Sequence, residues 1–275
     1  MLAPGSTLHD TLHFACQTNN LAAMQRLLAH AKPAALNKKL TAYEAGLDGT
    51  PLHIATRSGH LKAVRLLVAA GANLDIRDVG LQSALLIALE KKHEEIARFL
   101  LAAGANIFQK GAGGRTALHY AAIRCGREML ELLLQHGLAV NVLDGVKTSA
   151  LVYTTGLSEC NLEGAKALLD NGIDAAYLTP AFKEACWRNN TELAQLFIEN
   201  GADIASETTP KSELLFWICG LGHAATVQLL LKYGVDFTTK AKFRGRMNSY
   251  NGSPLDKALE AGQQHVAALI QQPTA

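Results

Sequence analysis

The sequence predicts an all-α solenoid of about eight helix–turn–helix units with short β-hairpin-like loops, because two ladders of residues recur along it in step. A six-residue pattern that begins at Thr50 returns at Ser83, Thr116 and Ser149, each time after 33 residues. A glycine follows about sixteen residues behind the end of each pattern, and these glycines form the second ladder: Gly71, Gly104, Gly137, Gly172, Gly201 and Gly234. Two coupled ladders indicate stacked units that share one core.

The second unit shows why each repeat should fold as two helices. Thr50 can cap a helix, and Pro51 suits the first helical turn, where its missing N–H costs nothing. After a turn at Ser58–His60, apolar residues recur every three or four positions from Leu61 to Val68, which predicts an amphipathic second helix. Gly71 stands where a left-handed residue ends such a helix. Neither helix can bury its apolar face alone, so the units must stack.

Two stretches carry a specific resemblance. The segments Asp48–Ala55, which reads Thr-Pro-Leu-His-Ile-Ala from Thr50, and Gly114–Ala122 resemble the ankyrin-repeat family, whose signature and period they match. The resemblance covers roughly residues 8–271 and implies one domain over 1–275. The implied units span approximately 8–38, 46–78, 79–111, 112–144, 145–178, 179–207, 209–240 and 251–272, with atypical first and last units as caps.

Three departures from the period mark the places where this chain differs from a regular array. Extra residues fall in Lys32–Leu47, and a second insertion of about six residues falls in Lys240–Asn251, which holds four cations and no acid. The connection Ile173–Thr179 has lost about four residues, so one hairpin should be shortened. The basic insertion could contact an acidic partner or nucleic acid, although a solvated loop is the simpler interpretation.

The family resemblance implies a non-catalytic module that binds a partner protein through its concave groove and hairpin tips, as an adaptor, inhibitor or effector. Carried over by position, the groove residues follow each signature alanine by two or three places: Arg57, Glu90, Ile123, Arg124, Trp187 and Arg188. The hairpin-tip residues are Leu47, Val79, Leu81, Gln82 and Arg115. The basic insertion adds Phe243, Arg244 and Arg246.

Trp187 is the preferred hot spot of this set, because Trp and Arg dominate measured interface energies. Arg188 and Arg124 occupy matching positions, although an irregular sixth unit could also turn Trp187 inward. Trp217 is expected in the core. Cys16, Cys186 and Cys219 share one repeat position and are expected to be core thiols, whereas Cys125, beside a turn glycine, is expected to be more exposed.

We find no sequence signature of an active site. His13, His53 and His119 fall at the signature position, where the resemblance implies hydrogen bonds between repeats. His93-Glu94-Glu95 lacks the second histidine of a zinc protease, and no phosphate-binding loop or nucleophile elbow is present. We therefore expect no enzyme activity, no metal and no cofactor. The rival hypotheses are a self-assembling structural scaffold, an ankyrin-based enzyme, and a nucleic-acid-associated factor that uses residues 240–251.

Bulk composition adds little to these hypotheses. Of the 275 residues 49% are hydrophobic and 18% are charged, and the net charge of +2 gives no long-range attraction to nucleic acid. We therefore expect a protein partner and a monomer rather than a nucleic-acid binder. Five scattered cysteines without zinc spacing indicate a reducing compartment. With no signal-peptide pattern and no apolar run long enough to span a membrane, we expect a cytoplasmic protein, or one secreted into a host by a signal-independent route.

Overall fold

The computed structural model describes residues 8–31, 36–42, 47–156, 160–209, 212–244 and 249–272. It gives the backbone, without the side chains, of residues 8–11, 40–42, 47–48 and 243–244. The chain forms two compact parts, an N-terminal part over residues 1–153 and a C-terminal part over residues 154–275. Each part is a stack of helix pairs, which confirms the predicted all-α repeat solenoid. The single domain over 1–275 stays a prediction.

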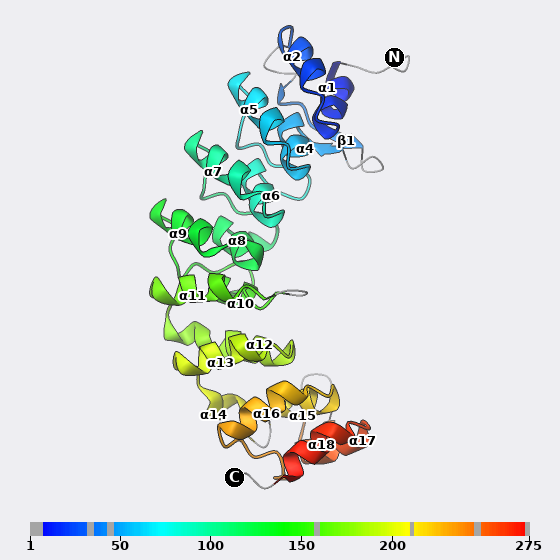
Figure 1. Cartoon of the computed structure of the whole chain (residues 1–275), viewed down its shortest axis with the longest axis vertical. Coiled ribbons are helices and arrows are strands. Elements are labelled where there is room, and N and C mark those ends of the chain that lie inside the picture. The colour runs from blue at the N-terminus through cyan, green and yellow to red at the C-terminus, as the bar shows by residue number, and fades with distance from the viewer. Residues whose placement is uncertain are drawn as a thin grey trace. The chain divides into compact units, whose positions relative to one another are not determined.

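In the N-terminal part the first helix of each pair contacts the first helix of the next pair. Figure 1 shows α4, α6 and α8 in one row, here called the inner helices, and α5, α7 and α9 in the other, the outer helices. The helices are α1 (Leu8–Gln17), α2 (Leu21–Leu28), α4 (Pro51–Arg57), α5 (Leu61–Ala69), α6 (Ala84–Glu90), α7 (Glu94–Ala102), α8 (Ala117–Arg124), α9 (Arg127–Gln135) and α10 (Ala150–Tyr153). A single 3₁₀ turn, η2 (Ala112–Gly114), precedes α8.

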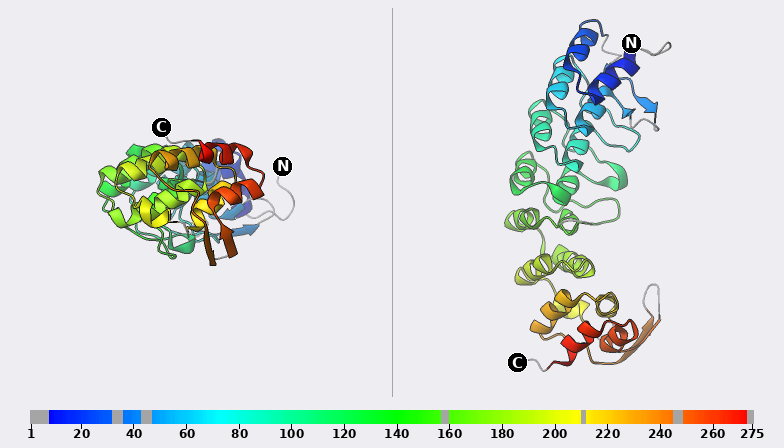
Figure 2. Two further views of the ribbon diagram at one scale, coloured as in Figure 1. Left: turned by 90° about the horizontal axis from the view of Figure 1, so that it is seen from below. Right: turned by 45° about the vertical axis from the view of Figure 1, so that its right-hand side comes forward.

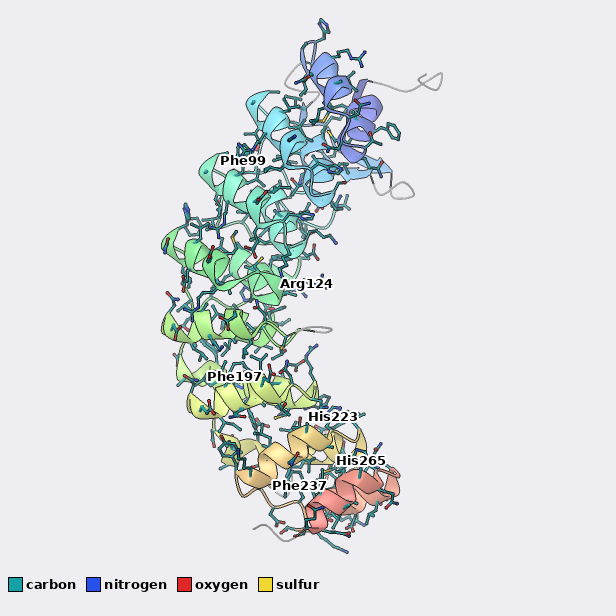
Figure 3. The ribbon with its side chains drawn as sticks, in the orientation of Figure 1. Phe99, Arg124, Phe197, His223, Phe237 and His265 are labelled. Atoms are coloured by element: carbon teal, nitrogen blue, oxygen red, sulfur yellow. The ribbon has the colours of Figure 1, made fainter. Side chains whose placement is uncertain are left out.

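The C-terminal part continues the same arrangement, with α12, α15 and α17 as inner helices and α13, α16 and α18 as outer ones. Its elements are α11 (Leu162–Asp170), η3 (Ala175–Tyr177), α12 (Leu178–Trp187), α13 (Thr191–Glu199), α14 (Ile204–Glu207), α15 (Glu213–Gly220), α16 (Ala224–Lys232), α17 (Pro254–Glu260) and α18 (Gln264–Gln271). Phe182, Phe197 and Phe237 are fully buried here, and Figure 3 labels the last two. The shortened connection is the 3₁₀ turn η3, which runs directly into α12.

Both insertions contribute a short antiparallel hairpin. In the N-terminal part β1 (Leu40–Ala42) pairs with β2 (Leu47–Gly49), and in the C-terminal part β3 (Ala241–Arg244) pairs with β4 (Ser249–Gly252). The register of the second hairpin places Phe243 opposite Tyr250. Figure 2 shows this hairpin projecting from the helices of the C-terminal part.

The local rules read from the second repeat are confirmed. Thr50 is the N-cap of α4 in extended backbone geometry, and it forms a reciprocal capping box with His53 while Pro51 occupies the first helical turn. Gly71 follows α5 with a φ of 87°, a left-handed conformation that costs glycine little. A Cβ added at Gly71 would meet no atom within 4 Å, so the backbone conformation of this residue rather than its packing requires glycine.

In the first, second and fourth repeats a buried imidazole connects the repeat to the next one, as the resemblance implied. The Nδ1 atom of His53 accepts a hydrogen bond from the Thr50 N–H at 3.0 Å, and its Nε2 lies 2.9 Å from the carbonyl oxygen of Ile76. His119 repeats the arrangement and reaches the carbonyl oxygen of Thr148 at 3.1 Å. His13 reaches that of Gly49 at 3.0 Å. These histidines are structural.

In the third and fifth repeats, which lack the histidine, the hydroxyl of the helix-capping serine has no imidazole partner. Leu86 replaces the histidine in the third repeat, and Val152 replaces it in the fifth. The capping hydroxyls of Ser83 and Ser149 are buried, and among the described residues neither has a hydrogen-bond partner. The imidazole therefore accounts for the satisfied threonine caps at positions 50 and 116.

The expected exposure of Cys125 is wrong. Its side chain is fully buried, and its Sγ donates to the carbonyl oxygen of Leu89 at 3.4 Å. The turn positions that match it, Gly59 and Lys92, have φ angles of 75° and 59°, but Cys125 is extended with a φ of −76°. The extended backbone turns the thiol into the core, where burial raises its pKa to about 12. Cys16, Cys186 and Cys219 are buried as predicted.

Replacing His53 by Leu should destabilise the fold. The substitution leaves the Thr50 N–H and the Ile76 and Gln82 carbonyl groups without their imidazole partner, at a cost of about 3 kcal/mol. His136→Leu is the matched control, because His136 is exposed at the end of α9, and it should change stability by less than about 0.5 kcal/mol. Urea denaturation followed by circular dichroism measures both. Equal stability of the two variants would contradict the bridging role.

The neutral imidazole of His53 should also make stability depend on pH. Burial lowers its pKa to about 4, from 6.5 in the absence of burial, so the unfolded chain binds this proton first as the pH falls. The neutral imidazole contributes fully to the free energy of unfolding above pH 6.5. That contribution, on the order of 3 kcal/mol, is lost as the pH falls from 6.5 towards 4. Denaturation of wild type and His53→Leu at several pH values separates that loss from the titration of other groups. Parallel losses in the two proteins would refute it.

Candidate protein-binding surface

The predicted groove residues share one structural position, the C-terminal end of an inner helix. Arg57, Glu90 and Arg124 are the last residues of α4, α6 and α8, and Trp187 is the last residue of α12. Figure 3 places Arg124 at the end of α8 on the side away from α9. Arg124 is exposed, whereas the other three are half-buried.

Three of the predicted residues in the N-terminal part are held by neighbouring side chains. The guanidinium of Arg57 donates to a carboxylate oxygen of Asp78 at 2.7 Å, and the Asp78 side chain is almost completely buried. The side-chain amide of Gln82 donates to a carboxylate oxygen of Glu90 at 2.9 Å. The ends of α4 and α6 are therefore both joined to the hairpin 78–82, which lies between these two helices in the sequence.

In the hairpin turns that carry the tip residues, an aspartate forms two hydrogen bonds with the residue four positions later. The backbone N–H of Asp78 donates to the carbonyl oxygen of Gln82, and the Gln82 N–H donates to the Asp78 carboxylate at 2.8 Å. Asp144 makes the corresponding pair with Thr148, at 3.0 and 2.8 Å. These bonds hold the turn between the paired residues in one conformation.

Apolar side chains lie on the outside of these turns. Val79 and Leu81 are 49% and 48% exposed, and Val146 is 77% exposed. Leu81 has a φ of 62°, and Gly114 and Lys147 at the matching positions of the next two turns have 73° and 63°. Only the fourth repeat uses the glycine that this left-handed geometry favours.

Arg115 forms a cluster with Tyr153 and Asp144 that the sequence analysis did not predict. Its Nε donates to the Tyr153 hydroxyl oxygen at 3.1 Å, and that hydroxyl donates to the Asp144 carboxylate at 2.7 Å. The Arg115 guanidinium also lies over the Tyr153 ring, 5.3 Å from its centroid. Burial pushes the pKa of Asp144 upward, but the hydrogen bonds from Tyr153, Thr148 and Val146 outweigh it and leave that pKa below its ordinary value.

In the C-terminal part the two tryptophans lie together. The rings of Trp187 and Trp217 are tilted with their centroids 5.2 Å apart, and both residues are half-buried. Trp217, which we expected in the core, therefore lies partly at the surface beside the predicted hot spot. Among the described residues neither buried indole N–H has a hydrogen-bond acceptor. Arg188 is exposed and donates from Nε to Glu184 at 2.8 Å.

The remaining predicted residues are only partly described. Leu47 lies in β2, and Phe243 and Arg244 lie in β3, by backbone alone. Arg246 lies outside the described residues. Ile123 is half-buried next to Arg124. We did not predict Trp217, Tyr153 and Asp144 as site residues from the sequence. Trp217 and Tyr153 share the fifth position of the six-residue pattern, and large aromatic residues at that position could have indicated them.

Among the described residues no group of three or more His, Cys, Asp or Glu side chains is placed to hold a metal ion. The described helices include none that is long and apolar enough to cross a membrane.

Tyr153→Phe tests the cluster at the fourth and fifth turns. Removing the hydroxyl takes a donor from Asp144 and an acceptor from Arg115, so the pKa of Asp144 should rise and stability should fall by about 1 kcal/mol. Carboxyl carbon NMR titration measures the pKa, and Tyr177→Phe, on the η3 turn, is the control. If the pKa of Asp144 is the same in Tyr153→Phe as in wild type, the Tyr153 hydroxyl does not help to lower that pKa.

The comparisons with known proteins agree with this architecture. A family model described as ankyrin repeats (3 copies) matches residues 12–111 and 182–275, and a single ankyrin-repeat model matches residues 113–145. The stretch between them, 146–181, contains the four-residue helix α10 and the η3 turn, where the repeats are least regular. A comparison with curated proteins gives no match. With most of its length matched, this chain belongs to the ankyrin-repeat family.

Proposed function

We propose that this chain is a non-catalytic protein that holds a partner protein against its hairpin tips and the ends of its inner helices, as an adaptor, inhibitor or effector. Ankyrin repeats are generally protein–protein interaction modules, which supports this proposal. The observation that carries the proposal is the exposure of Val79, Leu81 and Val146 on turns that are fixed by buried aspartates. Exposed apolar side chains on a rigid frame are typical of a surface that a partner covers.

The backbone at these tips supports the same conclusion. A non-glycine residue with positive φ costs about 1 kcal/mol, and Leu81 and Lys147 both carry that cost where Gly114 avoids it. A strained position that keeps a large apolar side chain outside the core is more readily explained by contact with a partner than by stability. Because Asp78 already closes the turn, binding would order little of the backbone.

In the C-terminal part, aromatic side chains add to the proposed binding surface. The Trp187–Trp217 pair presents two half-buried rings whose indole N–H groups lack an acceptor among the described residues. Trp is enriched at the residues that dominate interface energies, and the exposed parts of these half-buried rings can contact a partner. Arg188, exposed next to Trp187, adds a cation at the edge of this contact.

We further propose that the protein works as a cytoplasmic monomer. The five cysteines are free thiols, which suits a reducing compartment. Light scattering of the purified chain tests the monomer, because a self-assembling scaffold would show a mass above that of one chain at working concentration.

Capture from the cytosol of the source organism tests the binding proposal. The double variant Val79→Ser, Leu81→Asn removes both apolar groups of one tip, and asparagine tolerates the positive φ of position 81, so stability should be kept. Affinity for the captured protein should fall at least about tenfold, equivalent to the loss of a small apolar hot spot. Phe14→Ser, Phe108→Ser is the matched control, because both phenylalanines are 61% exposed and neither belongs to the turns 78–82 and 144–148.

Three results would contradict the proposal. In the first, wild type retains no protein that survives washing, and in the second, both variants retain the same partner with unchanged affinity. The third is a partner lost by the Phe14 and Phe108 control alone, which would move the binding surface away from the tips.

A further inference from the structure

Three adjoining hollows run along one side of the C-terminal part. The first, of about 420 Å³, is lined by Trp217, Leu221 and Tyr250 among others, and the second, of about 320 Å³, shares Tyr250 and Lys257 with it. The third, of about 420 Å³, shares Asn251 and Glu260 with the second and ends at Lys240. We call this row the C-terminal groove. It follows β4 and α17, and Figure 2 shows the hairpin that forms one wall.

The two ends of the groove differ in chemistry. At the first end Trp217 of α15 and the C-cap residue Leu221 line the groove together with Tyr250, whose ring packs on Phe216 with the centroids 5.0 Å apart. Leu221 is 49% exposed there, so an apolar surface is open to a ligand side chain. The other end is polar and includes Lys240, Asn251 and Asp256. The groove therefore suits a segment with an apolar residue at one end and polar residues at the other.

The charges beside the groove favour an acidic segment. Every carboxylate that lines its polar end has a partner: Asp256 lies 3.7 Å from Lys240, and Glu260 lies 3.4 Å from Lys257. Lys242 on β3 is exposed in addition, so three described lysines, at positions 240, 242 and 257, stand against these two carboxylates. The excess charge is therefore positive, and an acidic ligand gains from it at moderate salt.

We propose that the C-terminal groove binds an extended acidic peptide segment of the partner protein, with one apolar side chain in the hollow of Trp217 and Leu221 and carboxylates toward Lys240 and Lys242. The row of connected hollows fits an extended chain rather than a compact ligand. This inference rests on the proposed function and names the kind of partner segment that one part of the surface takes.

A substitution at Gly220 can fill the first hollow without straining the backbone. Gly220 is the last residue of α15 and lines the first hollow. A Cβ built there would meet only the Lys257 side chain, at 3.5 and 3.6 Å, which is ordinary contact. Gly220→Leu should therefore block the hollow while the chain folds as before, and Gly220→Ala, which adds one carbon, is its conservative control.

Selection of random dodecapeptides on the full chain, with binding then measured by fluorescence anisotropy, tests the proposal. We expect enriched peptides that carry one large apolar residue and several Asp or Glu on one side of it. Their affinity should fall about tenfold or more in Gly220→Leu and in Lys240→Glu, Lys242→Glu, and should weaken with added salt. Lys62→Glu, Lys92→Glu is the charge-matched control, because both lysines are exposed in the N-terminal part, and it should bind as wild type does.

Four outcomes overturn the proposal: no enrichment, enrichment of basic or uncharged peptides, affinity unchanged by Gly220→Leu in a chain that melts as wild type does, or oligothymidylate that binds with the same losses. The last would assign the groove to nucleic acid. Peptides that lose affinity in Val79→Ser, Leu81→Asn but keep it in Gly220→Leu would overturn the groove and leave the proposed function standing.

Discussion

Within each part the stacking of one inner helix on the next builds the core, and in the repeats that carry the histidine a buried imidazole fixes the register of that stacking. His53 accepts from the cap of its own helix and reaches the carbonyl oxygens of Ile76 and Gln82 in the hairpin that follows. His119 does the same toward Thr148. One side chain thus joins a helix start to the next hairpin turn. The position of the tip residues therefore depends on the same bonds that hold the repeats together.

That coupling explains how exposed apolar tips can be rigid. Asp78 closes its turn from within through the Gln82 N–H and is itself paired with Arg57, while Asp144 closes the later turn and accepts from Tyr153. A turn held by buried hydrogen bonds loses little entropy when a partner covers it. The left-handed backbone at Leu81 is tolerated in this frame because the surrounding bonds determine it.

The sequence was sufficient for features that depend on short spacing. The Thr50 cap, the first-turn Pro51 and the left-handed Gly71 follow from local rules, and the 33-residue period fixed which helices stack. Contacts between side chains of different repeats were not predictable in this way. Trp217 was assigned to the core because nothing in its own repeat places it against Trp187, thirty residues earlier.

The error at Cys125 has a similar origin. Its repeat position is left-handed in the two preceding repeats, but the backbone there is extended, and that choice of conformation is not visible in the residue type. The aspartates that close the turns also escaped the sequence analysis, because their role is defined by backbone N–H groups four residues away that only a folded turn brings together.

Amide hydrogen exchange on the chain with and without its captured partner tests the central claim most directly. The account predicts that the partner protects amides in the turns 78–82 and 144–148 and at the ends of the inner helices α4, α6 and α8, and leaves the outer helices α5, α7 and α9 unchanged. Protection confined to the outer helices, with the turns exchanging as they do in the free chain, would contradict it.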